Sequence, residues 1–184
     1  MKVITGFAKG RSLITPEGLD TRPTADRIKQ SVFNSIQFDI EGRRVLDLFA
    51  GSGQLGIEAL SRGAKCCTFV DSDSNAVNAV KSNLSVCQME NSSKVYHTDF
   101  DTFIKSNTDT FDLVFLDPPY REGLLEKALE AVVPFVSSYG IIVCEHLKEY
   151  YPPNIVGHLE TDKRYDHGRT TSVTIYRITQ SEED

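Results

Sequence analysis

Short apolar runs alternate along this chain with segments in which apolar residues recur every three or four positions. The apolar runs predict strands, whereas the three-to-four spacing predicts helices with one buried face. The strands predicted for the central part are residues 44–49, 66–70, 94–97, 111–116 and 140–144. The helices predicted between them are residues 54–62, 74–86, 101–105 and 123–135. Strands that alternate with helices indicate an α/β fold with a mostly parallel sheet covered on both faces.

The N-terminal part departs from this alternation. Residues 2–5 and 12–15 flank Gly6 and Gly10, a spacing that predicts a small hairpin. A helix with an N-terminal cap is predicted over residues 24–38, because an apolar stripe follows a capping residue there.

The C-terminal part departs from it as well. Residues 159–162 and 172–178 have the pattern of two strands with no helix between them, which predicts an antiparallel hairpin at the sheet edge. Residues 181–184 form an acidic tail that is expected to fray. We therefore divide the chain into an N-terminal extension, residues 1–22, a main domain, residues 23–180, and this tail.

Composition narrows the class of protein. The chain has 184 residues, enough for one domain, and its 40% hydrophobic and 25% charged residues are ordinary for a globular protein. No apolar run approaches the roughly 18 residues that cross a bilayer, and no signal peptide is visible. The four cysteines lack C-x-x-C spacing and no histidine pair accompanies them, so we expect a reduced cytoplasmic protein without a zinc site.

Charge is distributed unevenly. The net charge of −6 argues against a nucleic-acid partner, but residues 1–30 carry six basic and three acidic side chains. This excess indicates either a phosphate-rich ligand or a solvated basic face.

A glycine-rich segment, residues 47–56, connects the first central strand to the following helix. Gly51, Gly53 and Gly56 match G-x-G-x-x-G, although a tight strand-to-helix turn needs glycines for structural reasons alone. The acidic Asp71 at the end of the next predicted strand strengthens the match, because an acid there binds the ribose hydroxyls of an adenosine ligand.

Further acidic residues indicate which adenosine ligand is bound. Asp47, directly before the glycines, suits the amino group of S-adenosylmethionine and would repel the pyrophosphate of NAD. Asp99 is expected to meet the adenine amino group, with Phe100 beside the ring. The alternative is that Asp47 and Asp71 only cap the turn and a helix, and that Asp99 makes an Asx turn.

A second motif, Asp117-Pro118-Pro119-Tyr120, follows the apolar strand at residues 111–116. The two prolines stiffen a loop at the carboxyl edge of the sheet, where open α/β sheets bind ligands. The carboxylate of Asp117 and the carbonyl of Pro118 can both accept hydrogens of one exocyclic amine, and Asp117 can take the released proton. Tyr120 offers a ring on which a base can stack.

These motifs together resemble those of class I S-adenosylmethionine-dependent amino methyltransferases. Residues 21–27, Thr-Arg-Pro-Thr-Ala-Asp-Arg, and residues 32–34, Val-Phe-Asn, resemble the signature of the RsmD family, bacterial guanine-N2 methyltransferases of small-subunit ribosomal RNA. Residues 4–11 and 165–170 also resemble its pattern, so that the resemblance covers nearly the whole chain.

The resemblance implies a Rossmann-like, seven-stranded methyltransferase sheet with a small N-terminal extension. It implies S-adenosylmethionine as methyl donor, S-adenosylhomocysteine as product and no metal. It also implies that the protein is a monomer and that its partner is 16S rRNA, within a 30S or pre-30S particle. One departure is that Asp71 stands where glutamate is expected, which predicts a longer or water-bridged ribose contact.

Site residues follow from these motifs. The catalytic candidates are Asp117, Pro118, Pro119 and Tyr120. The cofactor-binding candidates are Asp47, Phe49, Gly51, Ser52, Gly53, Asp71, Ser72, Asp99 and Phe100. The RNA-binding candidates are Lys9, Arg11, Arg22, Thr24, Arg27 and Asn34, and Lys29 is expected to hold a phosphate beside them.

Three other functions fit part of the pattern. A DNA amino methyltransferase acting on adenine or cytosine would use the same Asp-Pro-Pro-Tyr chemistry, although the chain is short for a separate target-recognition domain. An NAD-dependent reductase would use the same glycine turn. A non-enzymatic RNA-binding or assembly factor would use the fold alone.

Overall fold

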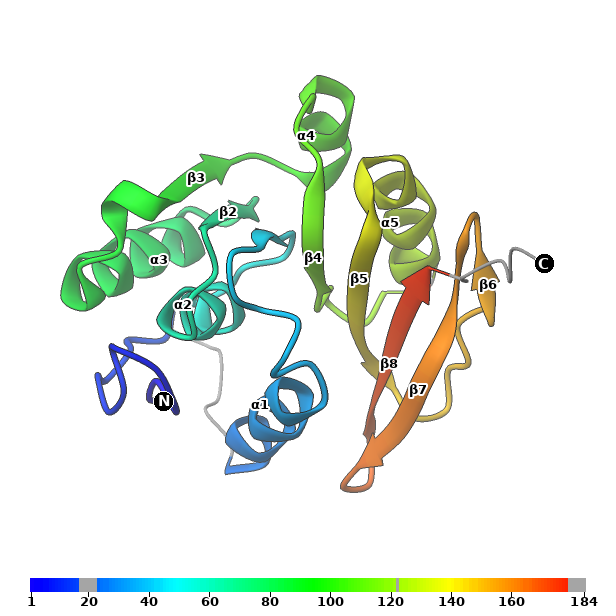
Figure 1. Ribbon diagram of the computed structural model, residues 1–184, viewed down its shortest axis with the longest axis horizontal. Helices are drawn as coiled ribbons and strands as arrows, with labels where there is room; N and C mark the ends of the chain where they lie inside the picture. Colours follow the sequence, from blue (N-terminus) through cyan, green and yellow to red (C-terminus); the bar gives the residue numbers. More distant parts are fainter. Residues whose placement is uncertain (17–22, 122, 179–184) are drawn as a thin grey trace.

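The computed structural model describes residues 1–16, 23–121 and 123–178, with the backbone alone at residues 23–25. Within these residues, eight strands form one sheet in the order β3-β2-β1-β4-β5-β8-β7-β6 (Figure 1). The strands are β1 (Arg44–Asp47), β2 (Cys66–Asp71), β3 (Ser93–His97), β4 (Phe111–Leu116), β5 (Val136–Leu147), β6 (Ile155–Val156), β7 (Leu159–His167) and β8 (Thr171–Ile178). The first five pair in parallel and the last three antiparallel, which confirms the predicted α/β class and C-terminal hairpin.

Five α-helices and two short 3₁₀ helices are found in the same described residues. They are α1 (Pro23–Ser35), α2 (Gln54–Ser61), α3 (Ser74–Cys87), α4 (Phe100–Ser106), α5 (Leu124–Val132), η1 (Glu90–Ser92) and η2 (Val133–Phe135). None of these helices is long and apolar enough to cross a bilayer.

Several predicted boundaries are wrong. The sheet has an eighth strand because the two-residue β6, which gives no alternation to detect, pairs with β7. The helix predicted over residues 123–135 ends at Val132, since Pro134 cannot continue an α-helix and the chain passes into η2. β5 begins at Val136 rather than at Gly140, and its first residue pairs with Phe111 across an irregularity in the ladder.

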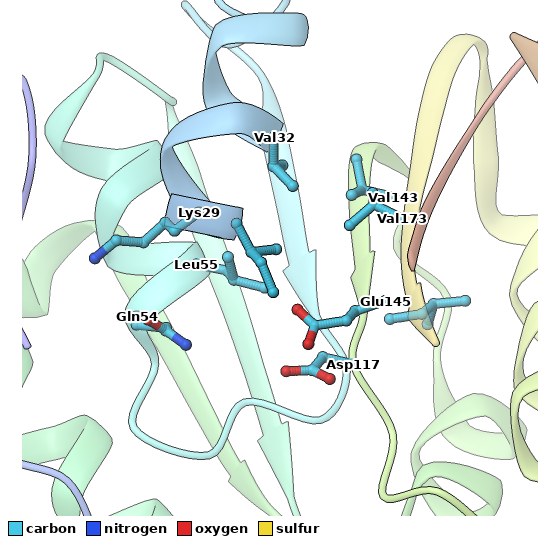
Figure 2. A pocket seen from close by; sticks show the side chains of 10 residues that line it. Lys29, Val32, Gln54, Leu55, Asp117, Val143, Glu145 and Val173 are labelled. Carbon is cyan, nitrogen blue, oxygen red and sulfur yellow. The ribbon is translucent and has the colours of Figure 1, made fainter. Parts of the chain in front are cut away.

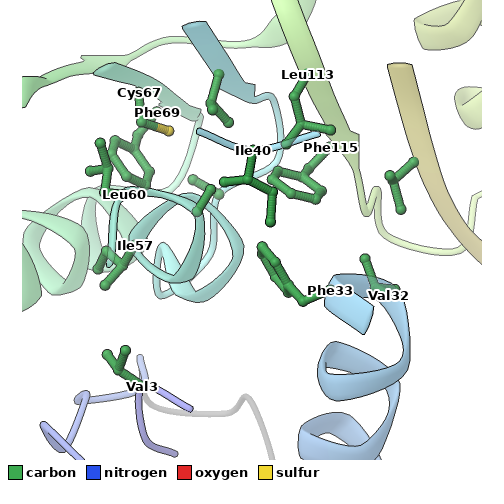
Figure 3. Close-up of a cluster of buried hydrophobic side chains, with 14 of the residues drawn as sticks. Val3, Val32, Phe33, Ile40, Ile57, Leu60, Cys67, Phe69, Leu113 and Phe115 are labelled. Atoms are coloured by element: carbon green, nitrogen blue, oxygen red, sulfur yellow. The ribbon is translucent and has the colours of Figure 1, made fainter. Parts of the chain in front are cut away.

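Two hydrophobic cores lie on opposite faces of the sheet, because successive strand residues point to opposite faces. In β4, Leu113 and Phe115 pack with α1, α2 and α3, whereas Val114 and Leu116 pack with α4 and α5. Figure 3 shows the first core, in which the ring of Phe33 from α1 faces Phe115, with centroids 5.6 Å apart. The helix α1 therefore covers the sheet beside the carboxyl end of β4.

The N-terminal segment, residues 1–16, packs against α2 and α3. It forms the predicted hairpin, but with a single bridge between Lys2 and Ser12 instead of two strands. Gly6 permits its close approach to α2: its φ is 86°, and a Cβ there would lie 1.6 Å from the carbonyl oxygen of Ser61. The hairpin is short because its amides bind α2 side chains: Ile4 and Thr5 donate to Glu58 at 2.8 and 3.0 Å.

Candidate active site

Three carboxylates come together at the carboxyl edge of the sheet. β1 lies between β2 and β4, so Asp47 at the end of β1 is flanked by Asp71, which ends β2, and Asp117, which follows β4. Burial and these two acidic neighbours raise the pKa of Asp47 to about 8. At neutral pH Asp47 is therefore mostly protonated, and a cationic ligand beside it would favour its charged form.

The glycine turn between β1 and α2 is held from both sides. Gly51 and Gly53 have φ values of 55° and 75°, a conformation that side chains with a Cβ rarely adopt. The amide of Gly51 donates to Asp71 Oδ2 at 2.8 Å, and the amide of Gly56 donates to Asp47 Oδ2 at 3.0 Å. Asp47 is only 2% exposed. Both acids thus support the turn, as the capping alternative expects for Asp47 but not for Asp71, which it assigned to a helix cap, while their carboxylate oxygens retain lone pairs for further donors.

The other candidates for cofactor binding lie around this turn. Asp99 is the N-cap of α4 and accepts from the amide and hydroxyl of Thr102, as the Asx-turn alternative expects, and these bonds lower its pKa. The ring of Phe100 packs on Phe49 with centroids 5.7 Å apart. Ser52 is buried within the turn, and Ser72 is exposed after β2. The helix cap after β2 is Asp73, whose side chain accepts from Asn75.

Asp117 lines a cavity of about 100 Å³ between α1, the first turn of α2 and the ends of β4 and β5 (Figure 2). Gln54 and Leu55, directly after the glycine turn, line the same cavity. Burial raises the pKa of Asp117 to about 6, so that it is a carboxylate at neutral pH and a weak base. The structure therefore brings the Asp-Pro-Pro-Tyr loop and the end of the glycine turn to one cavity.

Glu145 is a residue of this cavity that the sequence reasoning missed. Figure 2 shows its carboxylate facing that of Asp117. Burial and the negative Asp117 raise the pKa of Glu145 to about 8. The available signal was its position directly after the apolar run of the fifth predicted strand, at the same edge of the sheet as Asp117.

A second cavity of about 280 Å³ lies on the other side of the Asp-Pro-Pro-Tyr loop. Pro118, Pro119 and Tyr120 line it together with Tyr150, and Glu145 borders both cavities. Tyr120 is 54% exposed, and burial of its hydroxyl near Thr171 and Glu145 raises its pKa. The loop thus presents an accessible aromatic ring beside the buried carboxylates.

The RNA-binding candidates have different positions. Lys9 and Arg11 are exposed in the N-terminal hairpin, and Arg27 and Asn34 are exposed on α1. Residues 5–8 bond to Ser61 at the end of α2 that is distant from the glycine turn, so this hairpin does not line the Asp117 cavity. Arg22 and the side chain of Thr24 lie outside the described residues.

Lys29 does not have the predicted position. Its side chain is buried, its ammonium donates to the carbonyl of Lys2 at 2.7 Å, and it lies 3.9 Å from Glu58. Burial lowers the pKa of Lys29. The expectation of a phosphate contact is wrong because charge counting along a sequence does not show which helix face is buried.

Residues 1–177 match the model of a family described as conserved hypothetical protein 95. Ribosomal RNA small subunit methyltransferase D of Haemophilus influenzae is 35% identical, over 98% of this chain and 94% of its own length. The chain belongs to the RsmD family.

Two further similar proteins support the same assignment. This RsmD-family chain is 43% identical to the Bacillus subtilis protein YlbH over 96% of this chain and 98% of that protein. The solved structure of the Escherichia coli protein yhhF superposes with a TM-score of 0.87 at 29% identity and covers 97% of both chains. The Rossmann-like class I methyltransferase fold expected from the sequence is confirmed.

Proposed function

We propose that this RsmD-family protein transfers a methyl group from S-adenosylmethionine to N2 of a guanine in 16S rRNA. The observation that carries the proposal is the shared cavity of Asp117 with Gln54 and Leu55, at the start of the helix that follows the glycine turn. A methyl-donor loop and a loop that holds an aromatic amine must meet if transfer is to be direct. The name of the Haemophilus influenzae relative supports ribosomal RNA of the small subunit as the substrate.

The residues around the turn fit the proposed methyl donor. S-Adenosylmethionine supplies a methyl group activated on a sulfonium sulfur, and it carries a second cation in its ammonium group. A cationic group beside Asp47 would favour the charged form of this buried acid, whereas a pyrophosphate placed next to Asp47 and Asp71 would oppose it. Phe49 and Phe100 would flank the adenine, and Asp71 would bind the ribose.

Asp117 has two tasks in the proposed mechanism. The N2 lone pair of guanine is delocalised into the ring, so the amine is a poor nucleophile. Acceptance of its two hydrogens by Asp117 and the carbonyl of Pro118 would draw the nitrogen toward tetrahedral geometry. Once N2 has gained the methyl group it must lose a proton, and Asp117 is the acceptor.

The target guanine must leave its stack to reach this cavity. Tyr120, exposed beside the cavity, would stack on the extruded base. Arg27 on α1 and the exposed cations of the N-terminal extension would hold phosphates. An acidic enzyme that works as a monomer in the cytoplasm fits an assembling small subunit, where ribosomal proteins supply part of the positive charge.

The first prediction tests this function. Wild-type enzyme with methyl-labelled S-adenosylmethionine should label 16S rRNA or 30S particles from cells lacking the gene, and mass spectrometry should find N2-methylguanine. Asp117→Asn should lower the labelling rate by about 10²–10⁴-fold, because the base is lost. Its affinity for S-adenosylhomocysteine, measured by calorimetry, should stay within about twofold of the wild-type value, on the order of 0.4 kcal/mol.

Asp109→Asn is the matched control, since Asp109 is exposed before β4 at the opposite edge of the sheet. Labelled DNA with silent rRNA would refute the substrate. Binding of NADH without S-adenosylhomocysteine would refute the methyl donor. Unchanged turnover in Asp117→Asn would remove Asp117 from the mechanism.

A further inference from the structure

Glu145 lies beside Asp117 because of the register between β4 and β5. Leu116 and Cys144 are paired neighbours in these parallel strands, so the next residues, Asp117 and Glu145, emerge together at the carboxyl edge. Both line the cavity that the proposed function assigns to the reacting amine, and Figure 2 shows their carboxylates facing each other. The proposed methyl transfer uses only one of these carboxylates, that of Asp117, so it assigns no role to Glu145.

The polar lining of this cavity consists mainly of hydrogen-bond acceptors. Besides the two carboxylates it includes the amide of Gln54, whose nitrogen lies on the side of Asp117 in Figure 2 and whose buried Oε1 atom has no partner among the described residues. Lys29 also lines the cavity, but Figure 2 shows its ammonium directed away, toward the bond with the carbonyl of Lys2. A ligand that fills the cavity must therefore bring several N–H donors with it.

The hydroxyl of Tyr120 favours Glu145 as an acceptor. Tyr120 lies beside Glu145, and its hydroxyl lowers the pKa of Glu145 against the larger effect of burial. N–H donors from a ligand act in the same direction, since hydrogen bonds to the charged form of a carboxyl favour that form. With a donor-rich ligand in place, Glu145 presents a charged acceptor next to that of Asp117.

Among the bases with exocyclic amines, guanine alone matches two adjacent acceptors. Its Watson–Crick edge presents N1–H beside the N2 amine, whereas adenine and cytosine present their amines beside a bare ring nitrogen that accepts hydrogen bonds. A carboxylate opposite that bare nitrogen would face a second acceptor without a proton between them. We propose that Glu145 selects guanine by accepting N1–H of the base while Asp117 accepts a hydrogen of N2, an assignment that rests on the proposed function.

The second prediction tests this assignment with 2-aminopurine, which keeps the amine but has a bare N1. The probe is 16S rRNA ligated around a synthetic segment that carries guanine or 2-aminopurine at the nucleotide methylated by the wild-type enzyme. The wild-type enzyme should prefer guanine by at least about 100-fold in kcat/KM, because 2-aminopurine leaves Glu145 unpaired. Glu145→Gln should reduce this preference to less than about tenfold, since the glutamine amide can donate to N1 of 2-aminopurine and accept from N1–H of guanine.

Two further variants separate recognition from folding. Glu145→Asp keeps a charged acceptor, so it should keep the preference for guanine even at a lower rate. Glu149→Gln changes an exposed acid near the end of β5 and should behave as wild type. Melting temperature and affinity for S-adenosylhomocysteine establish that each variant is folded with an intact donor site.

The outcomes distinguish this assignment from the proposed function. If the wild-type enzyme methylates a base other than guanine, both are wrong. If it methylates guanine N2 and Glu145→Gln keeps the wild-type preference, only the assignment of Glu145 is overturned. Weakened binding of S-adenosylhomocysteine in Glu145→Gln, with an unchanged preference, would instead place the ammonium group of the methyl donor against Glu145.

Discussion

At the scale of single residues, the chemistry of this protein depends on buried acids, in which burial disfavours the charged form of the carboxyl group. Asp117 and Glu145 share one small cavity, and burial raises the pKa values of both. The two acids differ in how readily the sequence alone identifies them as site residues. Asp117 was predictable because two prolines follow it at the end of a strand, whereas Glu145 belongs to a strand that continues beyond it and carries no motif.

The third prediction concerns pH and belongs to Asp117. Burial raises its pKa to about 6, and only the ionised form can accept a proton from N2. The value of kcat/KM should therefore fall as the pH drops through about 6, while the ionisation of Glu145, whose pKa is about 8, should add a further rise toward alkaline pH. A profile between pH 5 and 9 at constant ionic strength measures this, and a rate independent of pH on the acid side would exclude Asp117 as the base.

At the scale of elements, the N-terminal segment is attached to α2 through a buried charge. Glu58 is 0% exposed and accepts from the amides of Ile4 and Thr5 and from Arg62 Nε, with Lys29 3.9 Å away. The sequence shows Glu58 as an ordinary polar position in an amphipathic helix. Apart from Arg62, four residues further along the chain, its partners are 29 to 54 residues distant, so only the folded chain shows that the N-terminal segment and α1 cover this helix face.

The fourth prediction is that Glu58→Ala lowers the free energy of unfolding by about 3–5 kcal/mol, because it leaves Lys29 and Arg62 without their buried counter-charge. Urea denaturation measures the change, and Glu90→Ala, at an exposed acid, should alter it by less than about 0.5 kcal/mol. Hydrogen exchange at the amides of Ile4 and Thr5 should accelerate in the same variant. Unchanged exchange there would contradict the attachment.

At the scale of the whole molecule, the topology was predictable because each strand and helix has a local period. The alternation of strands and helices determines a parallel sheet, and the carboxyl ends of its strands must then share one edge. The distribution of charge in space was not predictable, since positions along the chain do not show which cations reach the surface. Arg27 is exposed on α1, whereas Lys29, two residues later, is buried.

The fifth prediction uses this difference. Arg27→Gln should raise the KM for 30S particles and reduce the slope of log KM against log salt by about 1, the effect of one lost phosphate contact. Lys65→Gln is the control, because Lys65 is exposed directly before β2, at the amino edge of the sheet. Equal effects of the two variants would mean that RNA is attracted by net charge and not held along α1.

The side chain of Asn83 on α3 links two distant stretches of chain. It exchanges hydrogen bonds with the backbone of Ile14, and it donates to the carbonyl of Ser52 in the glycine turn at 2.8 Å. A shortened chain starting at Pro23 would retain all the loops around the cavity. It would lose the hydrogen bonds between Ile14 and Asn83, and Glu58 would lose its bonds to Ile4 and Thr5. A catalytic fragment made by removing the residues before Pro23 is therefore expected to bind the methyl donor more weakly than the full chain.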